Sequence, residues 1–437
     1  MKPLTSKDVD WPPVPRCDPN GRLFYYESGL YRAMRGFERP FYESLVERIH
    51  ANDALRARLP ETDLTDLALE QSTAVLSHEL ITPVTRPHEW SSLMFQQAAL
   101  CHCDVHLELA RYGYTLHDAH PWNVAFKGAQ PVFLDFGSIV RPGQRGGVRR
   151  SLVREYFHYF VHPMYLMSKR QGDKCRRYLT HSNPPLELAD IRGYLGPLAL
   201  ARYGVLRSAT AALRVASRVA SPHALVEIVR AIRGQIASLR IRDGRSRFRG
   251  YHDDEFSRDS SNWHAKQRHV CELLDGLRPR TVLDAGCATG WYSLAAAERG
   301  ARVVAVDVED AMVNAVYRLA AERKLPITTA VKNLFDDAPD NDKYAADVVL
   351  ALAVVHHLVF SQGWDFEAIA RTLARYSRRC LVTEFIDRGD TFVKQHMTGG
   401  HDWYNLPSFQ AALSKHFRTI TLHRSTSENR TLVVCHK

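Results

Sequence analysis

The chain has 437 residues, of which 45% are hydrophobic and 24% charged, and its formal net charge is +10. This is the composition of an ordinary globular protein of two or three domains, each large enough to bury a core. A bilayer-spanning helix is excluded, because the most apolar run, residues 348–355, is far shorter than a bilayer requires. The amino terminus has no apolar signal-peptide core and the eight cysteines have no paired spacing, so we expect a cytoplasmic protein with reduced thiols.

The first 140 residues mix short strand-like and helical segments. In chain order the pattern predicts a strand, a helical stretch, a long helix and a second strand with its exit, at residues 21–28, 39–59, 93–113 and 131–139. On the long helix, His102 and His106 have a spacing that suits zinc. No second ligand pair appears, so we expect these histidines to pack in the ordinary way and predict no metal site.

The segment 114–139 carries polar residues in the order of a protein-kinase centre. Asp118 is followed five residues later by Asn123, and an Asp-Phe-Gly triplet begins at Asp135. In kinases these positions are a catalytic Asp, a metal-binding Asn and a metal-binding Asp. The other half of such a centre is missing. Residues 1–110 contain no Gly-x-Gly-x-x-Gly loop and almost no lysine, and an arginine in place of the strand lysine cannot be located from sequence.

We therefore expect residues 1–140 to form an α+β region that folds partly like the lower half of a kinase. We expect it neither to bind ATP productively nor to transfer phosphate. Asp118 and Asn123 would instead hold their own loop through hydrogen bonds from side chain to backbone, a common use of Asp and Asn in turns. A phosphotransferase that uses this stretch is the less favoured alternative.

Most of the positive charge lies in residues 141–250, which hold 22 Lys and Arg against 6 Asp and Glu. The pattern there is helical, and we expect a separate arginine-rich helical segment over 141–245. Its arginines fall on two helix faces, formed by Arg207, Arg214 and Arg218 and by Arg230, Arg233 and Arg240. Such a face could meet nucleic acid or another acidic partner, but a solvated helical layer is the favoured interpretation. No aromatic residues alternate with these arginines to stack on bases.

Strands and helices alternate in the last part of the chain, which we expect to form one domain over 246–437. The predicted strands are residues 281–286, 302–307, 327–333, 346–357 and 378–385. Helices of ordinary length separate them, as in a doubly wound, mostly parallel Rossmann-like sheet. In such a sheet the ligand binds at the carboxyl ends of the strands.

Polar and glycine residues follow three of these strands. The first strand ends at Asp284 and leads into a turn with glycines at Gly286 and Gly290, where the backbone can approach a ligand closely. The second strand ends at Asp307, where a carboxylate can accept both hydroxyls of a ribose. Asn333 ends the third strand, where its amide could read an adenine edge.

This series resembles the class I S-adenosylmethionine-dependent methyltransferases over about residues 260–437. The resemblance implies that the first loop holds the methionine end of the cofactor, that Asp307 holds the ribose and that Asn333 contacts adenine. The chain departs from many members at Ala288, where they have a middle glycine. With its amino-terminal region included, the whole chain also resembles a family of large bacterial methyltransferases that carry a degenerate kinase-like region.

His356 and His357 follow the fourth apolar run, where the methyl acceptor is expected. A neutral histidine near pH 7 can take a proton from an oxygen or nitrogen nucleophile. One of the pair could instead pack in the core. The Asn/Asp-Pro-Pro-aromatic tetrapeptide of the family's exocyclic-amine enzymes is absent. We therefore expect a small-molecule or glycan acceptor, with an RNA methyltransferase that docks through residues 141–250 as the alternative.

Overall fold

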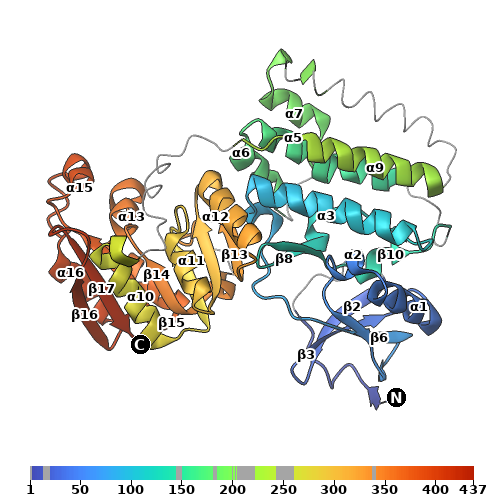
Figure 1. Ribbon diagram of the computed structural model, residues 1–437, viewed down its shortest axis with the longest axis horizontal. Helices are drawn as coiled ribbons and strands as arrows, with labels where there is room; N and C mark the ends of the chain where they lie inside the picture. Colours follow the sequence, from blue (N-terminus) through green and yellow to red (C-terminus); the bar gives the residue numbers. More distant parts are fainter. Residues whose placement is uncertain are drawn as a thin grey trace. The chain divides into compact units, whose positions relative to one another are not determined.

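The computed structural model describes most of the chain. The described residues are 2–12, 20–143, 150–180, 185–198, 200, 201, 203, 222–242, 260–336 and 341–437. The chain forms two compact units, Met1–Arg242 and Asp243–Lys437 (Figure 1). Unit 1 therefore includes both the region expected to resemble a kinase and the arginine-rich segment. Among the described residues no helix has the length and apolar character to cross a bilayer.

Unit 1 begins with an antiparallel sheet. Its strand order is β2 (Gly21–Tyr26), β3 (Gly29–Met34), β6 (Ala74–His78) and β4 (Thr62–Leu64), and β1 (Lys2–Leu4) pairs with β5 (Leu67–Leu69). The predicted helical stretch is two helices, α1 (Arg39–His50) and α2 (Asp53–Arg56). Asn52 separates them because its side chain accepts the Leu55 amide and caps the second helix.

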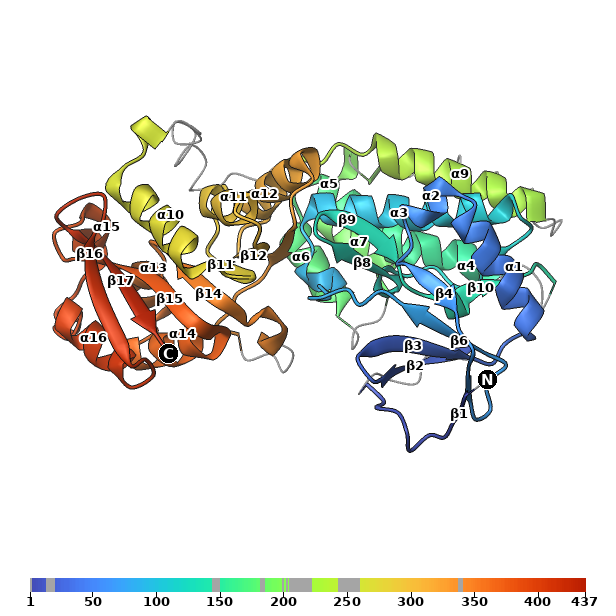
Figure 2. The same ribbon diagram turned by 60° about the horizontal axis from the view of Figure 1, so that its bottom comes forward.

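The rest of unit 1 is mainly helical. The long predicted helix is α3 (Ser92–Ala110), and α9 (Pro222–Ser238) lies beside it in both ribbon views (Figures 1 and 2). After α3 come β7 (Thr115–Leu116), the hairpin β8 (Val124–Lys127) and β9 (Gln130–Phe133), and β10 (Ile139–Val140), which pairs with β7. A continuous helical run then comprises α4 (Arg150–Glu155), a π-helical segment (Tyr156–Val161) and α5 (His162–Ser168). The short helices α6 (Gly172–Arg176) and α7 (Leu188–Tyr194) follow.

Unit 2 is a seven-stranded sheet. The strand order is β13 (Ile327–Val331), β12 (Arg302–Asp307), β11 (Thr281–Ala285), β14 (Ala346–Ala351), β15 (Ser377–Ile386), β17 (Arg430–His436) and β16 (Thr419–Arg424). The first five are parallel and β17 is antiparallel to both its neighbours. The predicted doubly wound, mostly parallel sheet is confirmed. The last two strands were not predicted.

Helices pack against this sheet and position its carboxyl edge. They are α10 (Ala265–Leu277), α11 (Trp291–Glu298), α12 (Asp310–Arg323), α13 (Val355–Gln362), α14 (Phe366–Tyr376), α15 (Thr391–His396) and α16 (Leu406–Ser414). The prediction of one strand over 346–357 was wrong at its end. β14 stops at Ala351, Ala353 adopts a left-handed conformation (φ +54°), and the chain turns into α13. The two histidines therefore lie in the first turn of a helix.

Candidate active site

The turn after β11 brings the backbone close to its neighbours. Gly286 and Gly290 have φ of +78° and +87°, and a Cβ at these positions would lie 2.5 Å from Val354 Cγ2 and 2.7 Å from Val316 Cγ2. The amides of Gly286 and Cys287 donate to the Val306 carbonyl at 2.8 and 3.0 Å. Both glycines are therefore required by conformation and by space, and the turn is fixed to the end of β12.

Asp284 lies beneath this turn. It is buried, and it accepts a hydrogen bond of 2.6 Å from the hydroxyl of Ser293 on α11. Burial, helped by the nearby Asp307 carboxylate and opposed by the Ser293 hydrogen bond, raises the pKa of Asp284 to about 6. Sequence alone did not indicate Ser293, because a serine inside a helix carries no signal of its own.

Asp307 stands at the end of β12 and faces the turn. Its carboxylate accepts the amides of Ala288 and Glu309 at 3.1 and 2.9 Å. Burial raises the pKa of Asp307 to about 6, although these hydrogen bonds act in the opposite direction. A carboxylate oxygen can accept more than one donor, so both oxygens retain capacity for the hydroxyls of a ligand.

Asn333 is engaged in its own turn. Its amide nitrogen donates to Asp336 at 3.1 Å and to Gln362 at 3.3 Å, and its oxygen accepts the Phe335 amide at 3.1 Å. The structure places it two residues beyond β13, at the same edge of the sheet as Asp284 and Asp307. Its contact with adenine stays a prediction.

His356 and His357 lie together at the start of α13. Their ring centroids are 4.0 Å apart, and both rings meet the ring of Phe392 on α15. His356 is the more buried, and burial lowers its pKa to about 3, with further contributions from His357 and Arg430. Burial also lowers the pKa of His357. Both imidazoles are therefore neutral at pH 7.

Two ion pairs that sequence reasoning missed lie near these histidines. Lys266 of α10 bonds Glu384 of β15 at 3.2 Å, with both side chains buried, and Arg430 of β17 bonds Asp390 at 3.1 Å. Lys266, Arg430 and Asp390 each act electrostatically on His356. A buried ion pair is weak evidence for stability because desolvation offsets its attraction. These pairs therefore place buried charged groups beside His356, and their contribution to stability is small.

Three buried polar atoms at this edge have no hydrogen-bond partner among the described residues. They are the hydroxyl of Thr289 in the glycine turn, Oε2 of Glu309 after β12 and Nδ1 of His356. Buried polar atoms in folded proteins are nearly always paired with protein, water or ligand. The three atoms belong to the glycine turn, the loop after β12 and the start of α13, so polar atoms suited to a nucleoside-containing cofactor occur at this edge.

The kinase-like residues of unit 1 also come together. Asn123 donates to Asp118 at 2.8 Å, and Ser138 donates to the same carboxylate oxygen at 2.9 Å. Asp135 accepts the Gly137 amide at 3.1 Å. Asp118 and Asn123 are thus bonded within their own segment, but through bonds between side chains and not through the expected bonds from side chain to backbone.

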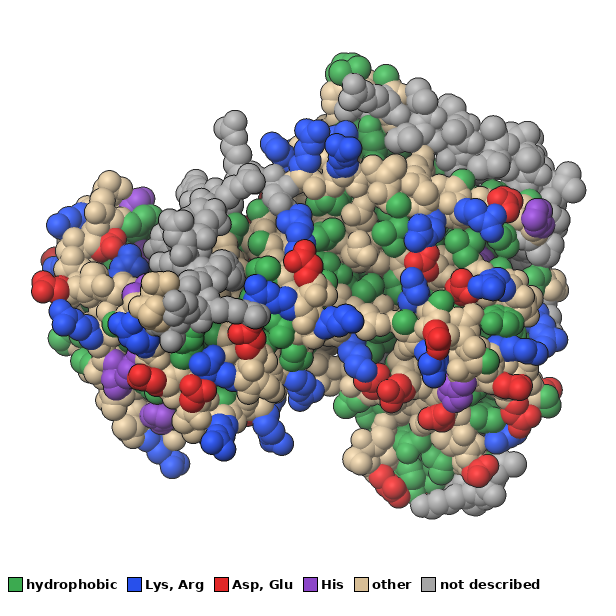
Figure 3. Space-filling model, in the orientation of Figure 1, with side chains coloured by type: hydrophobic (Ala, Val, Ile, Leu, Met, Phe, Trp, Pro, Cys, Tyr) green, Lys and Arg blue, Asp and Glu red, His purple; other side chains and the backbone are tan. Residues whose placement is uncertain are grey.

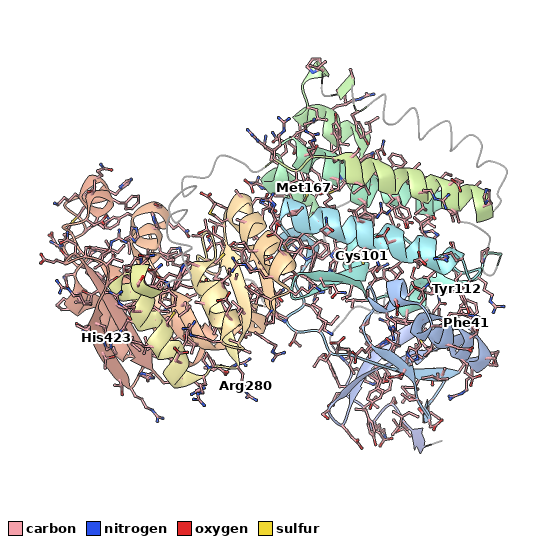
Figure 4. The ribbon with its side chains drawn as sticks, in the orientation of Figure 1. Phe41, Cys101, Tyr112, Met167, Arg280 and His423 are labelled. Atoms are coloured by element: carbon pink, nitrogen blue, oxygen red, sulfur yellow. The ribbon has the colours of Figure 1, made fainter. Side chains whose placement is uncertain are left out.

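The two histidines of α3 are engaged in the interior of unit 1. Nδ1 of His102 and Nδ1 of His106 both bond the Tyr156 hydroxyl at 3.0 Å, and Nε2 of His106 bonds Thr115 at 3.1 Å. Figure 4 shows the neighbouring Cys101 on α3 within the same unit. No group of three His, Cys, Asp or Glu side chains suited to a metal occurs among the described residues.

Two described arginines of the basic segment, both on α9, have acidic partners. On α9, Arg233 bonds Asp104 of α3 at 2.5 Å and Arg230 bonds Glu227. On the face of unit 1 shown in Figure 3, Lys and Arg side chains are interspersed with Asp and Glu. The other predicted arginine face, Arg207, Arg214 and Arg218, lies outside the described residues.

Comparison with known proteins identifies the carboxy-terminal unit. Residues 282–376 match the family described as "Methyltransferase domain". Nodulation protein NoeA of Rhizobium meliloti strain 1021 is 25% identical over 95% of this chain and 94% of its own length. The O-antigen chain terminator bifunctional methyltransferase/kinase WbdD of Escherichia coli is 32% identical over 112 residues, which are 24% of this chain and 16% of WbdD.

Solved structures are similar at a lower level. A structure of WbdD with a kinase inhibitor has a TM-score of 0.31, is 20% identical, and is matched over 39% of each chain. Magnesium protoporphyrin IX methyltransferase (ChlM) of Synechocystis PCC 6803 has a TM-score of 0.29 and is 19% identical, over 39% of this chain and 79% of its own. The family match, the strand order and the glycine–acid series agree. Unit 2 is a class I methyltransferase domain, and its cofactor is S-adenosylmethionine.

Proposed function

We propose that this methyltransferase transfers the methyl group of S-adenosylmethionine to an oxygen or nitrogen of a small-molecule or glycan acceptor. The observation that carries the proposal is Nδ1 of His356, a buried nitrogen without a described partner at the same sheet edge as the glycine turn. In the tautomer that leaves it unprotonated, a buried ring nitrogen of this kind can accept a hydrogen bond from a hydroxyl or amino group.

The cofactor would be held by five residues of the predicted set. The turn at Gly286 and Gly290, with Asp284 beneath it, would take the methionine end, Asp307 would take the ribose hydroxyls and Asn333 would lie near adenine. When bound, S-adenosylmethionine supplies an activated methyl group on a sulfonium. The protein's own part is to exclude water, to orient the acceptor and to hold its proton.

His356 and His357 would act on the acceptor. Both imidazoles are neutral at pH 7, since burial lowers their pKa values. A neutral ring can accept a proton from the attacking oxygen or nitrogen as methyl transfer proceeds. Phe392, whose ring meets both histidines, would give the acceptor an apolar wall.

The names of two relatives support a glycan acceptor and a role in nodulation. WbdD is called an O-antigen chain terminator, and O-antigen is a glycan; NoeA is called a nodulation protein. We therefore include a cytoplasmic role in nodulation in the proposal. RNA is the alternative acceptor, and the partners of Arg230 and Arg233 give it no support. Retardation of RNA with steep salt dependence would favour it.

Calorimetry with S-adenosylhomocysteine tests the cofactor site. We expect the wild-type chain to bind and Asp307→Ala to bind at least about tenfold more weakly, because hydrogen bonds to a carboxylate contribute about 1.5–3 kcal/mol. Asp275→Ala is the matched control, since Asp275 is exposed in the same unit and bonds Arg299. Equal affinity in wild type and Asp307→Ala would contradict the site. A screen of metabolites and glycans with labelled cofactor would then identify the acceptor.

A further inference from the structure

The segment 387–404, between β15 and α16, is a loop whose two ends are fixed to each other. The hydroxyl of Tyr404 donates to the Ile386 carbonyl at 2.8 Å, and Nε of Arg388 donates to the Tyr404 carbonyl at 2.9 Å. A second nitrogen of this guanidinium donates to the Asp402 carbonyl at 2.6 Å. Closed surface loops of this kind often carry functional residues, because a rigid scaffold positions them.

The start of this loop is held against the turn that precedes β17. The Asp387 amide donates to the Asn429 carbonyl at 2.8 Å, and a Cβ added to Gly389 would lie 2.5 Å from Asn429 Oδ1. Arg430 then bonds Asp390 at 3.1 Å, and these two side chains are only 19% and 18% exposed. A backbone hydrogen bond, a close approach and an ion pair therefore join the loop to the start of β17.

Asp390 also fixes α15, which lies beside α13 in both ribbon views (Figures 1 and 2). One carboxylate oxygen accepts the Phe392 amide at 2.9 Å and caps the helix, and the other accepts the bond from Arg430. The ring of Phe392 meets the rings of His356 and His357, with centroid distances of 5.2 and 4.6 Å. A single carboxylate therefore connects β17 to the ring that packs on both histidines.

Charged and titratable groups from several elements act on the two histidines. They are Asp390 before α15, His396 on α15, Arg430 on β17 and Lys266 on α10, which is paired with Glu384 of β15. Burial and His396 lower the pKa of His357, Asp390 acts to raise it, and Arg430 opposes Asp390. Burial alone would raise the pKa of Asp390, but the bonds from the Phe392 amide and Arg430 hold it below its usual value. Asp390 is therefore an ionised carboxylate at pH 7.

We propose that Asp390 and Arg430 are positioning residues for methyl transfer, a role that rests on the function proposed above. Arg430 holds Asp390 in place, and Asp390 holds Phe392 against the histidines. In the transfer step a lone pair of the acceptor's oxygen or nitrogen forms the bond to the methyl group, and the methyl–sulfur bond breaks with its electron pair moving to sulfur. The acceptor's proton passes to His356 or His357. That ring becomes an imidazolium, which the negative charge of Asp390 stabilises.

The test is an NMR titration of imidazole-labelled histidine in the full chain without added ligand. The readout is the titration midpoint of His357, the more exposed of the two rings, assigned from the spectrum of His357→Gln. Asp390→Asn keeps the helix cap and removes the charge, so the midpoint should move to lower pH by about 0.5 pH unit or more. Arg430→Gln removes the opposing cation and should move it to higher pH. Asp402→Asn is the matched control, because Asp402 is exposed in the same loop and the substitution keeps its backbone carbonyl.

Two further measurements test the link from Asp390 to Phe392 and to the reaction. Asp390→Ala removes both cap and charge, so the amides of α15 should exchange about fivefold faster than in wild type, whereas Asp390→Asn should leave their exchange unchanged. Labelled-methyl transfer to the pool of metabolites and glycans at pH 7 should be at least about twofold slower in Asp390→Asn than in Asp402→Asn.

Three results would overturn the proposal. One is a His357 midpoint that does not move in Asp390→Asn, and another is movement in the same direction in Asp390→Asn and Arg430→Gln. The third is unchanged exchange of α15 in Asp390→Ala, because the carboxylate would then hold nothing in place. A wild-type chain that transfers no methyl group to any member of the pool counts against the proposed function instead, and the titration and exchange results still show whether the pair acts on the histidines.

Discussion

Replacing Gly286 by alanine should destabilise the edge of the methyltransferase sheet. The added Cβ would lie 2.5 Å from Val354 Cγ2, and the backbone has a φ of +78° that L-residues adopt at a cost. The left-handed conformation costs about 1–2 kcal/mol. Forcing a methyl group into a packed site costs typically about 1–3 kcal/mol. We therefore expect a loss of about 2–5 kcal/mol in local stability.

Gly300→Ala separates these two contributions. Gly300 has nearly the same conformation, with a φ of +87°, but nothing lies within 4 Å of an added Cβ. It should cost only the conformational part, about 1–2 kcal/mol. The double variant Gly286→Ala with Val354→Ala removes the contacting methyl group. It should recover part of the loss, which a variant strained only in its backbone would not do.

Amide hydrogen exchange in the full chain is the suitable assay. The protein has two units, so a single unfolding free energy is not well defined, whereas exchange reports the opening of particular strands. The amides to follow are those of β11 and β14, which flank the turn. If Gly286→Ala opens these strands no more easily than Gly300→Ala, the contact with Val354 does not limit the turn, and the reasoning fails.

Three further predictions follow from the buried polar groups. The pKa of Asp307 is about 6 in the folded chain, above the ordinary value of 3.8. Protonation of Asp307 therefore stabilises the fold without cofactor. This contribution is complete below about pH 4 and is lost as the pH rises through 6. S-adenosylhomocysteine needs the ionised carboxylate, so its affinity should fall below pH 6 by up to about tenfold per unit, and Asp307→Asn should abolish the dependence in calorimetry. His356→Ala should lower labelled-methyl transfer by about 10²–10⁴-fold with cofactor binding retained, whereas joint loss of binding and melting temperature would make the residue structural. Tyr156→Phe leaves two buried histidine nitrogens unpaired and should cost about 1–3 kcal/mol by exchange of α3 amides; an unchanged value would show that water replaces the hydroxyl.

The sequence predicted the methyltransferase sheet well because its signals are local. A buried parallel strand is a short apolar run, and the turn after β11 has glycine at two of its three positions with positive φ, so both features can be recognised from neighbouring residues. The end of β14 was misjudged for the same reason. Apolar residues continue through Val354 and Val355, and periodicity cannot distinguish a buried strand from the start of a buried helix. Only the left-handed backbone at Ala353 marks the change, and alanine gives no warning of it.

The parts that could not be predicted depend on residues far apart in the chain. Arg32 and Asp135 are separated by 103 residues, and Lys266 and Glu384 by 118. The sequence of the strand Gly29–Met34 does not show which of its side chains will meet a turn formed about a hundred residues later, because that depends on the register of the sheet. The cation beside Asp135 is therefore an arginine from a distant strand, which the sequence could not locate. The order of Asp118, Asn123 and Asp135 is a local signal that the sequence shows directly. The contact between Arg32 and Asp135 forms only when the chain folds.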